Sequence, residues 1–90
     1  MHHILFVDDD ANVLQGLRRR LKTLRPDWNL HFANSGSAAL SMAKDQSFDV
    51  IVTDIQMPGM DGVALLEEMQ KIQPDAVRII LTGHASNDSY

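Results

Sequence analysis

Apolar and polar positions follow two different periods along the 90-residue chain, and each period predicts one kind of element. Short, mostly apolar runs at residues 4–7, 48–53 and 76–81 are typical of strands covered on both faces. Residues 28–33 alternate apolar with polar side chains, which favours a strand nearer the edge of a sheet. The pattern therefore predicts four strands.

Helical spacing separates these strands. Apolar side chains recur at helical intervals over residues 13–24, and the same period returns at 38–44 and at 63–72. Residues 34–37 are rich in serine, asparagine and glycine, so they predict a turn and a helix cap. Strict alternation of strands and helices predicts an α/β fold, with a mostly parallel sheet, right-handed crossovers and helices on both faces.

Acidic side chains stand where two of the predicted strands end. Asp8 and Asp9 follow the first strand, Asp54 ends the third, and Thr82 follows the fourth. Ligands of such sheets bind outside the carboxyl ends of the strands. Two carboxylates ~4 Å apart repel by about 4 kcal/mol at an effective dielectric near 20, so a cation is expected among them. Oxygen ligands indicate Mg²⁺, and Asp54 beside it is the predicted nucleophile towards phosphorus.

Simpler interpretations of the same residues stay open at this point. Carboxylates at strand ends also occur as helix caps with solvated neighbours, and we expect Asp10 to cap or begin the first helix. Thr82 also fits an ordinary strand end, and His84 also fits an exposed loop. His2 and His3 are expected as strand-edge or disordered residues.

Composition narrows the classes of function. The net charge of −4, from 8 Lys and Arg against 12 Asp and Glu, argues against direct nucleic-acid binding by this chain. The absence of cysteine excludes a disulfide scaffold and a thiolate metal site. No signal-peptide pattern and no membrane-spanning run of roughly 18 apolar residues is present. We therefore expect one cytoplasmic domain over residues 1–90, with no membrane partner.

Three segments carry a family resemblance: ILFVDDDANV, DVIVTDIQMPGMDG and RIILTGHAS. Together, in this order and separation, they resemble the receiver domain of bacterial two-component response regulators, from residue 4 to about residue 86. The resemblance implies a flavodoxin-like, doubly wound parallel sheet of strand order 2-1-3-4. It implies Asp8 and Asp9 as the metal-binding pair for Mg²⁺, Asp54 as phosphoacceptor, the Gln56 backbone carbonyl as a further metal ligand, and Thr82 as the switch hydroxyl. Pro58 and Gly62 match the loop after the acceptor.

The same resemblance implies a role in signalling. A sensor histidine kinase or phosphotransfer protein would pass a phosphoryl group to Asp54, and the altered protein-binding surface would act on an output domain or effector. Receiver domains are signalling phosphoacceptors, so no enzyme activity is expected beyond self-phosphorylation from small donors and self-dephosphorylation.

One departure from the family leads to an expectation about assembly. Receiver domains have a fifth strand and helix, with an active-site lysine at the end of that strand, and this sequence stops at Tyr90 before both. The chain is thus expected to be a receiver domain truncated before the fifth β-α unit. The apolar run 77–81 would then be an uncovered edge, and such edges pair with other chains. A homodimer or an exchange of elements is expected.

Two alternatives to the phosphoacceptor remain. The first is a receiver-like interaction or dimerisation module that is not phosphorylated in this truncated form. The second is a phosphatase or phosphotransferase of the haloacid dehalogenase type, whose nucleophile motif would begin with Asp8-x-Asp10. That motif would place Thr or Val where this chain has Asn12.

Overall fold

The computed structural model describes residues 2–57 and 59–81, so the predictions for Pro58, Thr82 and His84 lie outside the described residues. Seven elements alternate along the chain: β1 (His2–Val7), α1 (Ala11–Leu24), β2 (Trp28–Ala33), α2 (Gly36–Asp45), β3 (Val50–Asp54), α3 (Gly62–Ile72) and β4 (Val77–Leu81). The longest of these helices, α1, has 14 residues, and no described helix is long and apolar enough to cross a bilayer.

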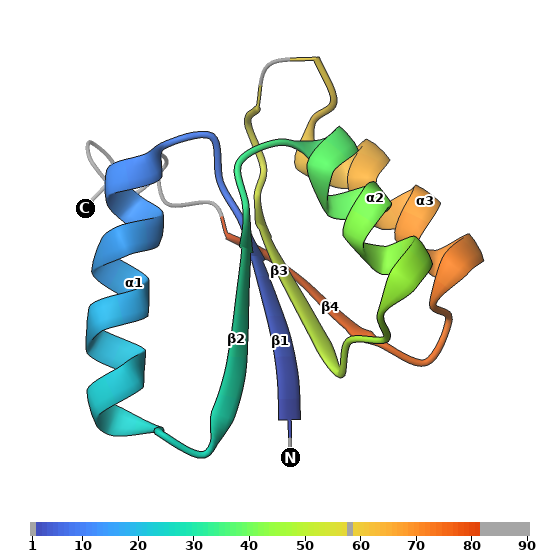
Figure 1. Cartoon of the computed structure of the whole chain (residues 1–90). Coiled ribbons are helices and arrows are strands. Elements are labelled where there is room, and N and C mark those ends of the chain that lie inside the picture. Colours follow the sequence, from blue (N-terminus) through green and yellow to red (C-terminus); the bar gives the residue numbers. More distant parts are fainter. Residues whose placement is uncertain (1, 58, 82–90) are drawn as a thin grey trace.

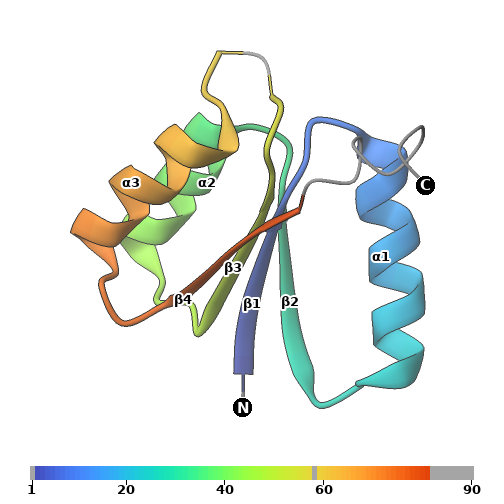
Figure 2. The ribbon, with the colours of Figure 1, turned by 180° about the vertical axis from the view of Figure 1, so that it is seen from behind.

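The four strands form one parallel sheet in the order β2-β1-β3-β4, which confirms the predicted strand order (Figure 1). Helix α1 lies on one face of the sheet, and α2 and α3 lie side by side on the other (Figure 2). Val7 pairs with Ala33 on one side and with Thr53 on the other. The carboxyl ends of β1, β2 and β3 therefore meet at the same edge of the sheet.

Alternation along the strands divides the apolar side chains between two clusters. Leu5 and Ile51, on the face covered by α2 and α3, are fully buried together with Leu65 and Met69 of α3. On the opposite face, a smaller cluster joins Ile4 and Phe6 to Leu14 of α1. Burial of both faces of β1 explains its continuous apolar run.

Element boundaries differ from the sequence prediction where side chains cap or replace backbone hydrogen bonds. Helix α2 begins at Gly36, two residues before the predicted start, because the Ser35 hydroxyl accepts a hydrogen bond from the Ala38 N–H (3.1 Å). Strand β3 begins two residues after the predicted start, since the Phe48 N–H donates to Oε1 of Gln73 (2.7 Å) rather than to a strand. These shifts leave the order of elements unchanged.

Candidate metal and phosphoryl site

The neighbouring strands β1 and β3 place Asp8, Asp9 and Asp54 at one edge of the sheet. Asp8 follows β1, and its N–H donates to the carbonyl oxygen of Ala33 in β2 (3.1 Å). Asp54 is the last residue of β3, and the next N–H, that of Ile55, donates to the carbonyl of Leu81 in β4 (3.2 Å). Backbone hydrogen bonds to neighbouring strands thus fix the chain on both sides of the site.

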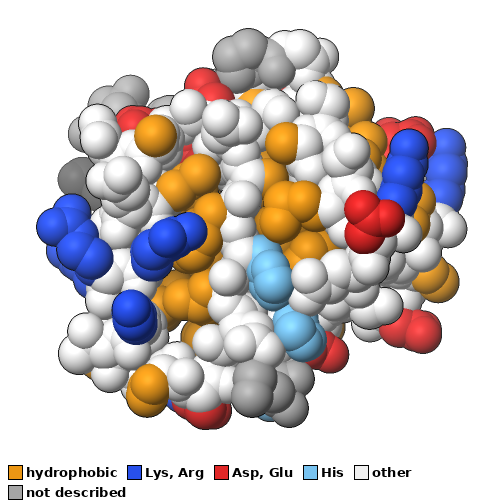
Figure 3. All heavy atoms as spheres, viewed as in Figure 1, with side chains coloured by type: hydrophobic (Ala, Val, Ile, Leu, Met, Phe, Trp, Pro, Cys, Tyr) orange, Lys and Arg blue, Asp and Glu red, His pale blue; other side chains and the backbone are white. Residues whose placement is uncertain are grey.

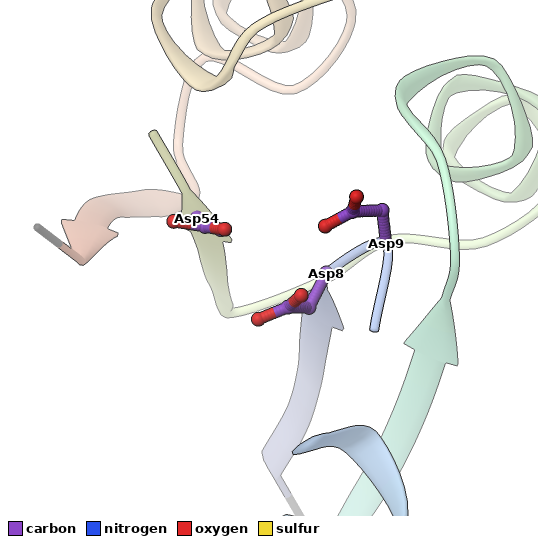
Figure 4. Close-up of side chains that lie close together, drawn as sticks. All are labelled: Asp8, Asp9 and Asp54. Carbon is purple, nitrogen blue, oxygen red and sulfur yellow. The ribbon is translucent and has the colours of Figure 1, made fainter. Parts of the chain in front are cut away.

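The three aspartates converge as the sequence predicts. Carboxylate oxygens of Asp8, Asp9 and Asp54 all lie within 4.8 Å of one another. Figure 4 shows the three side chains around a shared space, with Asp54 on β3 and the other two at the end of β1. Asp9 is exposed, whereas Asp8 and Asp54 are half-buried. The group is therefore open to solvent and to an incoming reactant on one side.

Asp10 has the different role that its position predicts. Its Oδ1 accepts a hydrogen bond from the Asn12 N–H (2.9 Å) and so caps α1, while its own N–H donates to Oδ1 of Asp8 (2.9 Å). The capping geometry leaves Asp10 outside the group of converging carboxylates. A nucleophile motif of the haloacid dehalogenase type requires Asp10 beside Asp8 in the site, so this arrangement argues against that alternative.

Electrostatics at the site favour a bound cation. The pKa of Asp8 is raised above its ordinary value, chiefly by burial; the N–H of Asp10 opposes the rise, and the carboxylates of Asp54 and Asp9 add to it. Mg²⁺ prefers a few carboxylate oxygens with space for retained waters, which this half-open group offers. Asp8, Asp9 and Asp54 therefore fit the ion chemically. Gln56 lies exposed in the loop after β3, and its carbonyl as a further ligand stays a prediction.

The raised pKa of Asp8 predicts how stability depends on pH. Without divalent cations, the folded chain holds the Asp8 proton more tightly than the unfolded chain, so the free energy of unfolding falls as pH rises from 3.8 through the raised pKa. The change is smaller than about 1 kcal/mol, because solvent screens this half-exposed group. Thermal unfolding in chelator between pH 3.5 and 7 measures it, and Asp8→Asn removes this contribution. An unchanged pH profile in Asp8→Asn would contradict the account.

Two residues beneath Asp54 support its position. The Thr53 hydroxyl is fully buried and donates to the carbonyl oxygen of Asp54 (3.0 Å). Gly62 begins α3, and its N–H donates to the carbonyl of Ile55 (2.9 Å). A Cβ at Gly62 would overlap the main-chain oxygen of Asp54, so only glycine allows this approach. The resemblance singled out Gly62 as a loop residue, but it gave no sign of this contact.

The methionines around the site are packing residues, as is typical of methionine near a core. Met57 is buried and Met69 is fully buried in the cluster beneath α2 and α3, and Met60 packs against the same cluster. The Met60 side chain also lies over Gly36, where a Cβ would press against its sulfur at 2.9 Å. The loop after β3 is thus held against the start of α2.

A parallel sheet of order β2-β1-β3-β4, with carboxylates converging at the ends of β1 and β3, defines the class of receiver domains with a flavodoxin-like fold. The family model described as "Response regulator receiver domain" matches residues 4–90. The chain belongs to this family of two-component response regulators.

Individual relatives agree with this assignment. The chain is 38% identical over 84 residues to the transcriptional regulatory protein GlrR of Escherichia coli, a match that covers 93% of this chain and 18% of GlrR. A Burkholderia pseudomallei response regulator, solved with a phosphorylated aspartic acid and a calcium ion, superposes with a TM-score of 0.83 at 29% identity, over 97% of this chain and 50% of that one.

A third relative was solved with a partner. A complex of the histidine kinase ThkA with the response regulator TrrA contains a chain that matches at a TM-score of 0.83 and 31% identity, covering all of this chain and 76% of that one. The chain spans about a fifth of the length of GlrR.

Proposed function

We propose that this chain accepts a phosphoryl group on Asp54 from a sensor histidine kinase or phosphotransfer protein, with Mg²⁺ as cofactor. The observation that carries the proposal is the convergence of Asp8, Asp9 and Asp54 within 4.8 Å at the ends of neighbouring strands. Membership of the receiver family supports it. Receiver domains are phosphoacceptors in signalling rather than enzymes with a released product.

The transfer is a displacement at phosphorus. An Asp54 carboxylate oxygen attacks the phosphorus atom, the bond from phosphorus to the donor's imidazole nitrogen breaks, and its electron pair remains on that nitrogen. Asp8, Asp9 and Asp54, with the Gln56 carbonyl, would hold Mg²⁺, which when bound neutralises charge on the phosphoryl oxygens. Asp10 orients Asp8 through its N–H, and Thr53 and Gly62 fix the end of β3.

Switching follows from the charge that the phosphoryl group brings. A phosphoryl group adds strong acceptor oxygens at the end of β3, and we assign the Thr82 hydroxyl as the donor that moves towards them. The protein-binding surface around the site then shifts its population of conformations. Water later attacks the phosphorus atom, releases phosphate and restores the Asp54 carboxylate.

The proposed partners follow from the relatives. ThkA is a histidine kinase seen in complex with a response regulator, which supports a kinase as the donor for this chain. GlrR is a transcriptional regulatory protein much longer than this chain, which supports an output domain or effector as the reader of the phosphorylated state. We place the exchange in the cytoplasm. The net charge of −4 supports contact through proteins rather than direct binding of nucleic acid.

Beryllofluoride binding tests this assignment, because the ion mimics a phosphoryl group attached to an aspartate. The chain is titrated with beryllofluoride in the presence of Mg²⁺, and bound fluoride is followed by ¹⁹F NMR. We expect Mg²⁺-dependent binding to the natural chain and none to Asp54→Ala. Binding that persists in Asp54→Ala would overturn the site assignment.

We propose in addition that the outer edge of β4 pairs with a second copy of the chain. Val77, Ile79 and Leu81 alternate along β4 and are 57%, 42% and 48% exposed. β4 pairs with β3 on one side, and within the described residues its other side carries no strand. Open apolar edges of this kind pair with other chains. The exposed apolar edge of β4 is the observation that favours an interaction module without phosphorylation as the second candidate function.

The substitution Ile79→Lys tests the pairing of β4. A lysine on an edge strand blocks edge-to-edge pairing, so we expect the dimer dissociation constant to rise at least about tenfold. Sedimentation equilibrium measures it, and Val13→Lys is the matched control, because Val13 is equally exposed (44%) but lies on α1. A natural chain that stays monomeric at high concentration would contradict the proposal.

A further inference from the structure

A histidine pair lies at the amino end of the sheet, far from the aspartates. His3 of β1 and His31 of β2 are half-buried on the face that α2 covers, and His3 Nδ1 is 3.1 Å from His31 Nε2. The side chain of Gln46, the residue that caps the C-terminus of α2, places its Nε2 2.8 Å from the first nitrogen and 3.1 Å from the second. Three polar atoms from three elements thus form a nearly equilateral triangle.

The triangle brings two potential metal-binding nitrogens close together. A neutral imidazole has one N–H and one lone pair, so each ring nitrogen that faces Gln46 carries a lone pair in one of its two tautomers. The pKa of His31 is lowered, first by burial and then by the nearby His3 ring. Burial therefore favours the neutral form of the His31 imidazole. Neutral imidazoles in this state are the form that binds metal ions.

We propose that His3 and His31 chelate a divalent transition-metal ion of the Zn²⁺ class through Nδ1 and Nε2, with Gln46 as the third ligand and water as the fourth. Nitrogens 3.1 Å apart and each about 2.05 Å from one ion subtend roughly 100°, close to a tetrahedral site. The ion takes the place of the Gln46 NH₂ group. The amide turns to present Oε1, and both imidazole rings pivot towards the shared point.

Surrounding contacts hold these ligands in place. The backbone N–H of His3 donates to Oδ2 of Asp49 (2.7 Å). The Phe48 ring packs edge-on against the His31 ring, with the two ring centroids 5.2 Å apart. The backbone of Gln46 is anchored by Gln73, whose Nε2 donates to the Gln46 carbonyl (2.6 Å). Figure 3 shows histidine side chains reaching the surface beside an apolar patch, so an ion can enter from solvent. Anchored ligands lose less freedom when a metal binds.

The histidine site and the aspartate site differ in place and chemistry. Five residue steps along β1, from His3 to Asp8, cover roughly 16 Å. Imidazole nitrogens suit Zn²⁺, whereas carboxylates with retained waters suit Mg²⁺. An ion on His3, His31 and Gln46 would join β1, β2 and α2 at the end of the sheet opposite the proposed phosphoryl site. The inference therefore stands whether or not Asp54 accepts a phosphoryl group.

Thermal unfolding of the whole chain tests the site. Mg²⁺ is kept in excess so that the aspartates are occupied, and the midpoint temperature is compared with and without Zn²⁺. We expect Zn²⁺ to raise the midpoint of the natural chain and to lose this effect in His3→Ala and in His31→Ala. His2→Ala is the matched control, because His2 is the adjacent imidazole on the opposite face of β1, beside Ile4 and Phe6. The His2→Ala variant should keep the full rise in midpoint temperature that Zn²⁺ causes in the natural chain.

Direct binding supplies the second readout. Co²⁺ replaces Zn²⁺ at nitrogen sites and gives a visible absorption band, so a Co²⁺ titration measures binding. Loss of one of the two imidazole ligands should weaken Co²⁺ binding by roughly 100-fold. Far-ultraviolet circular dichroism checks that each variant folds, and His31→Gln replaces His31→Ala if the latter does not. Equal Zn²⁺ shifts in the His3, His31 and His2 variants, or no shift in the natural chain, would overturn the proposal.

Discussion

Replacing Asp54 by asparagine is expected to reduce phosphoryl transfer to the chain to background, a loss of at least roughly 1,000-fold. The amide is nearly the same size as the carboxylate but lacks the anionic oxygen that attacks phosphorus. Asp8 and Asp9 remain in place, so the variant separates the acceptor from the rest of the acidic group. Incubation with a radiolabelled, phosphorylated histidine kinase measures the transfer.

The matched control for this variant is Asp10→Asn. It removes one negative charge from the same segment, and asparagine caps helices as well as aspartate does, so α1 keeps its N-terminal cap. We expect Asp10→Asn to keep most of the transfer. Transfer to Asp54→Asn at the rate of the natural chain would show that another residue is the acceptor.

Replacing Gly62 by alanine is expected to have the largest effect on stability, a loss of about 2–3 kcal/mol. The new Cβ overlaps the main-chain oxygen of Asp54, so either the start of α3 or the end of β3 must move. A loss of 1 kcal/mol lowers the unfolding midpoint of a domain this size by roughly 4–8 °C. Calorimetry measures the shift in the unfolding midpoint. Because the substitution would displace Asp54, we also expect Gly62→Ala to bind Mg²⁺ more weakly.

Gly16→Ala is the control for the effect of removing a glycine. Gly16 lies within α1, and no atom outside the adjoining helix backbone is within 4 Å of a Cβ built there. Alanine in a helix interior stabilises by up to about 1 kcal/mol relative to glycine, so this variant should be more stable than the natural chain. A Gly62→Ala chain as stable as Gly16→Ala would contradict the close packing beneath Asp54.

Much of the site follows from local sequence. Apolar runs before Asp8 and Asp54 predict buried parallel strands, and parallel strands bring their carboxyl ends to one edge, where both residues lie. The helix cap at Asp10 is likewise a local interaction, between an aspartate side chain and an N–H two residues later. Features that depend on neighbouring residues or on the period of one strand were therefore predictable.

Features that depend on contact between distant segments were not predictable in this way. The late start of β3 results from a hydrogen bond between distant residues. The side chain of Gln73, 25 residues after Phe48, accepts a hydrogen bond from the Phe48 N–H. The His3 and His31 pair needs the register of β1 on β2 and the position of Gln46 at the end of α2. Alternation within each strand places both imidazoles on one face, but a single sequence does not give the distance between them.

Chemical trapping shows which residue carries the phosphoryl group, and we expect that residue to be Asp54. The chain is treated with Mg²⁺ and phosphoramidate, reduced with borohydride, and digested for mass spectrometry, since reduction converts an aspartyl phosphate into homoserine. We expect homoserine at position 54, formed only when Mg²⁺ is present. Homoserine at another aspartate, or none at all with Mg²⁺ and donor in excess, would contradict it.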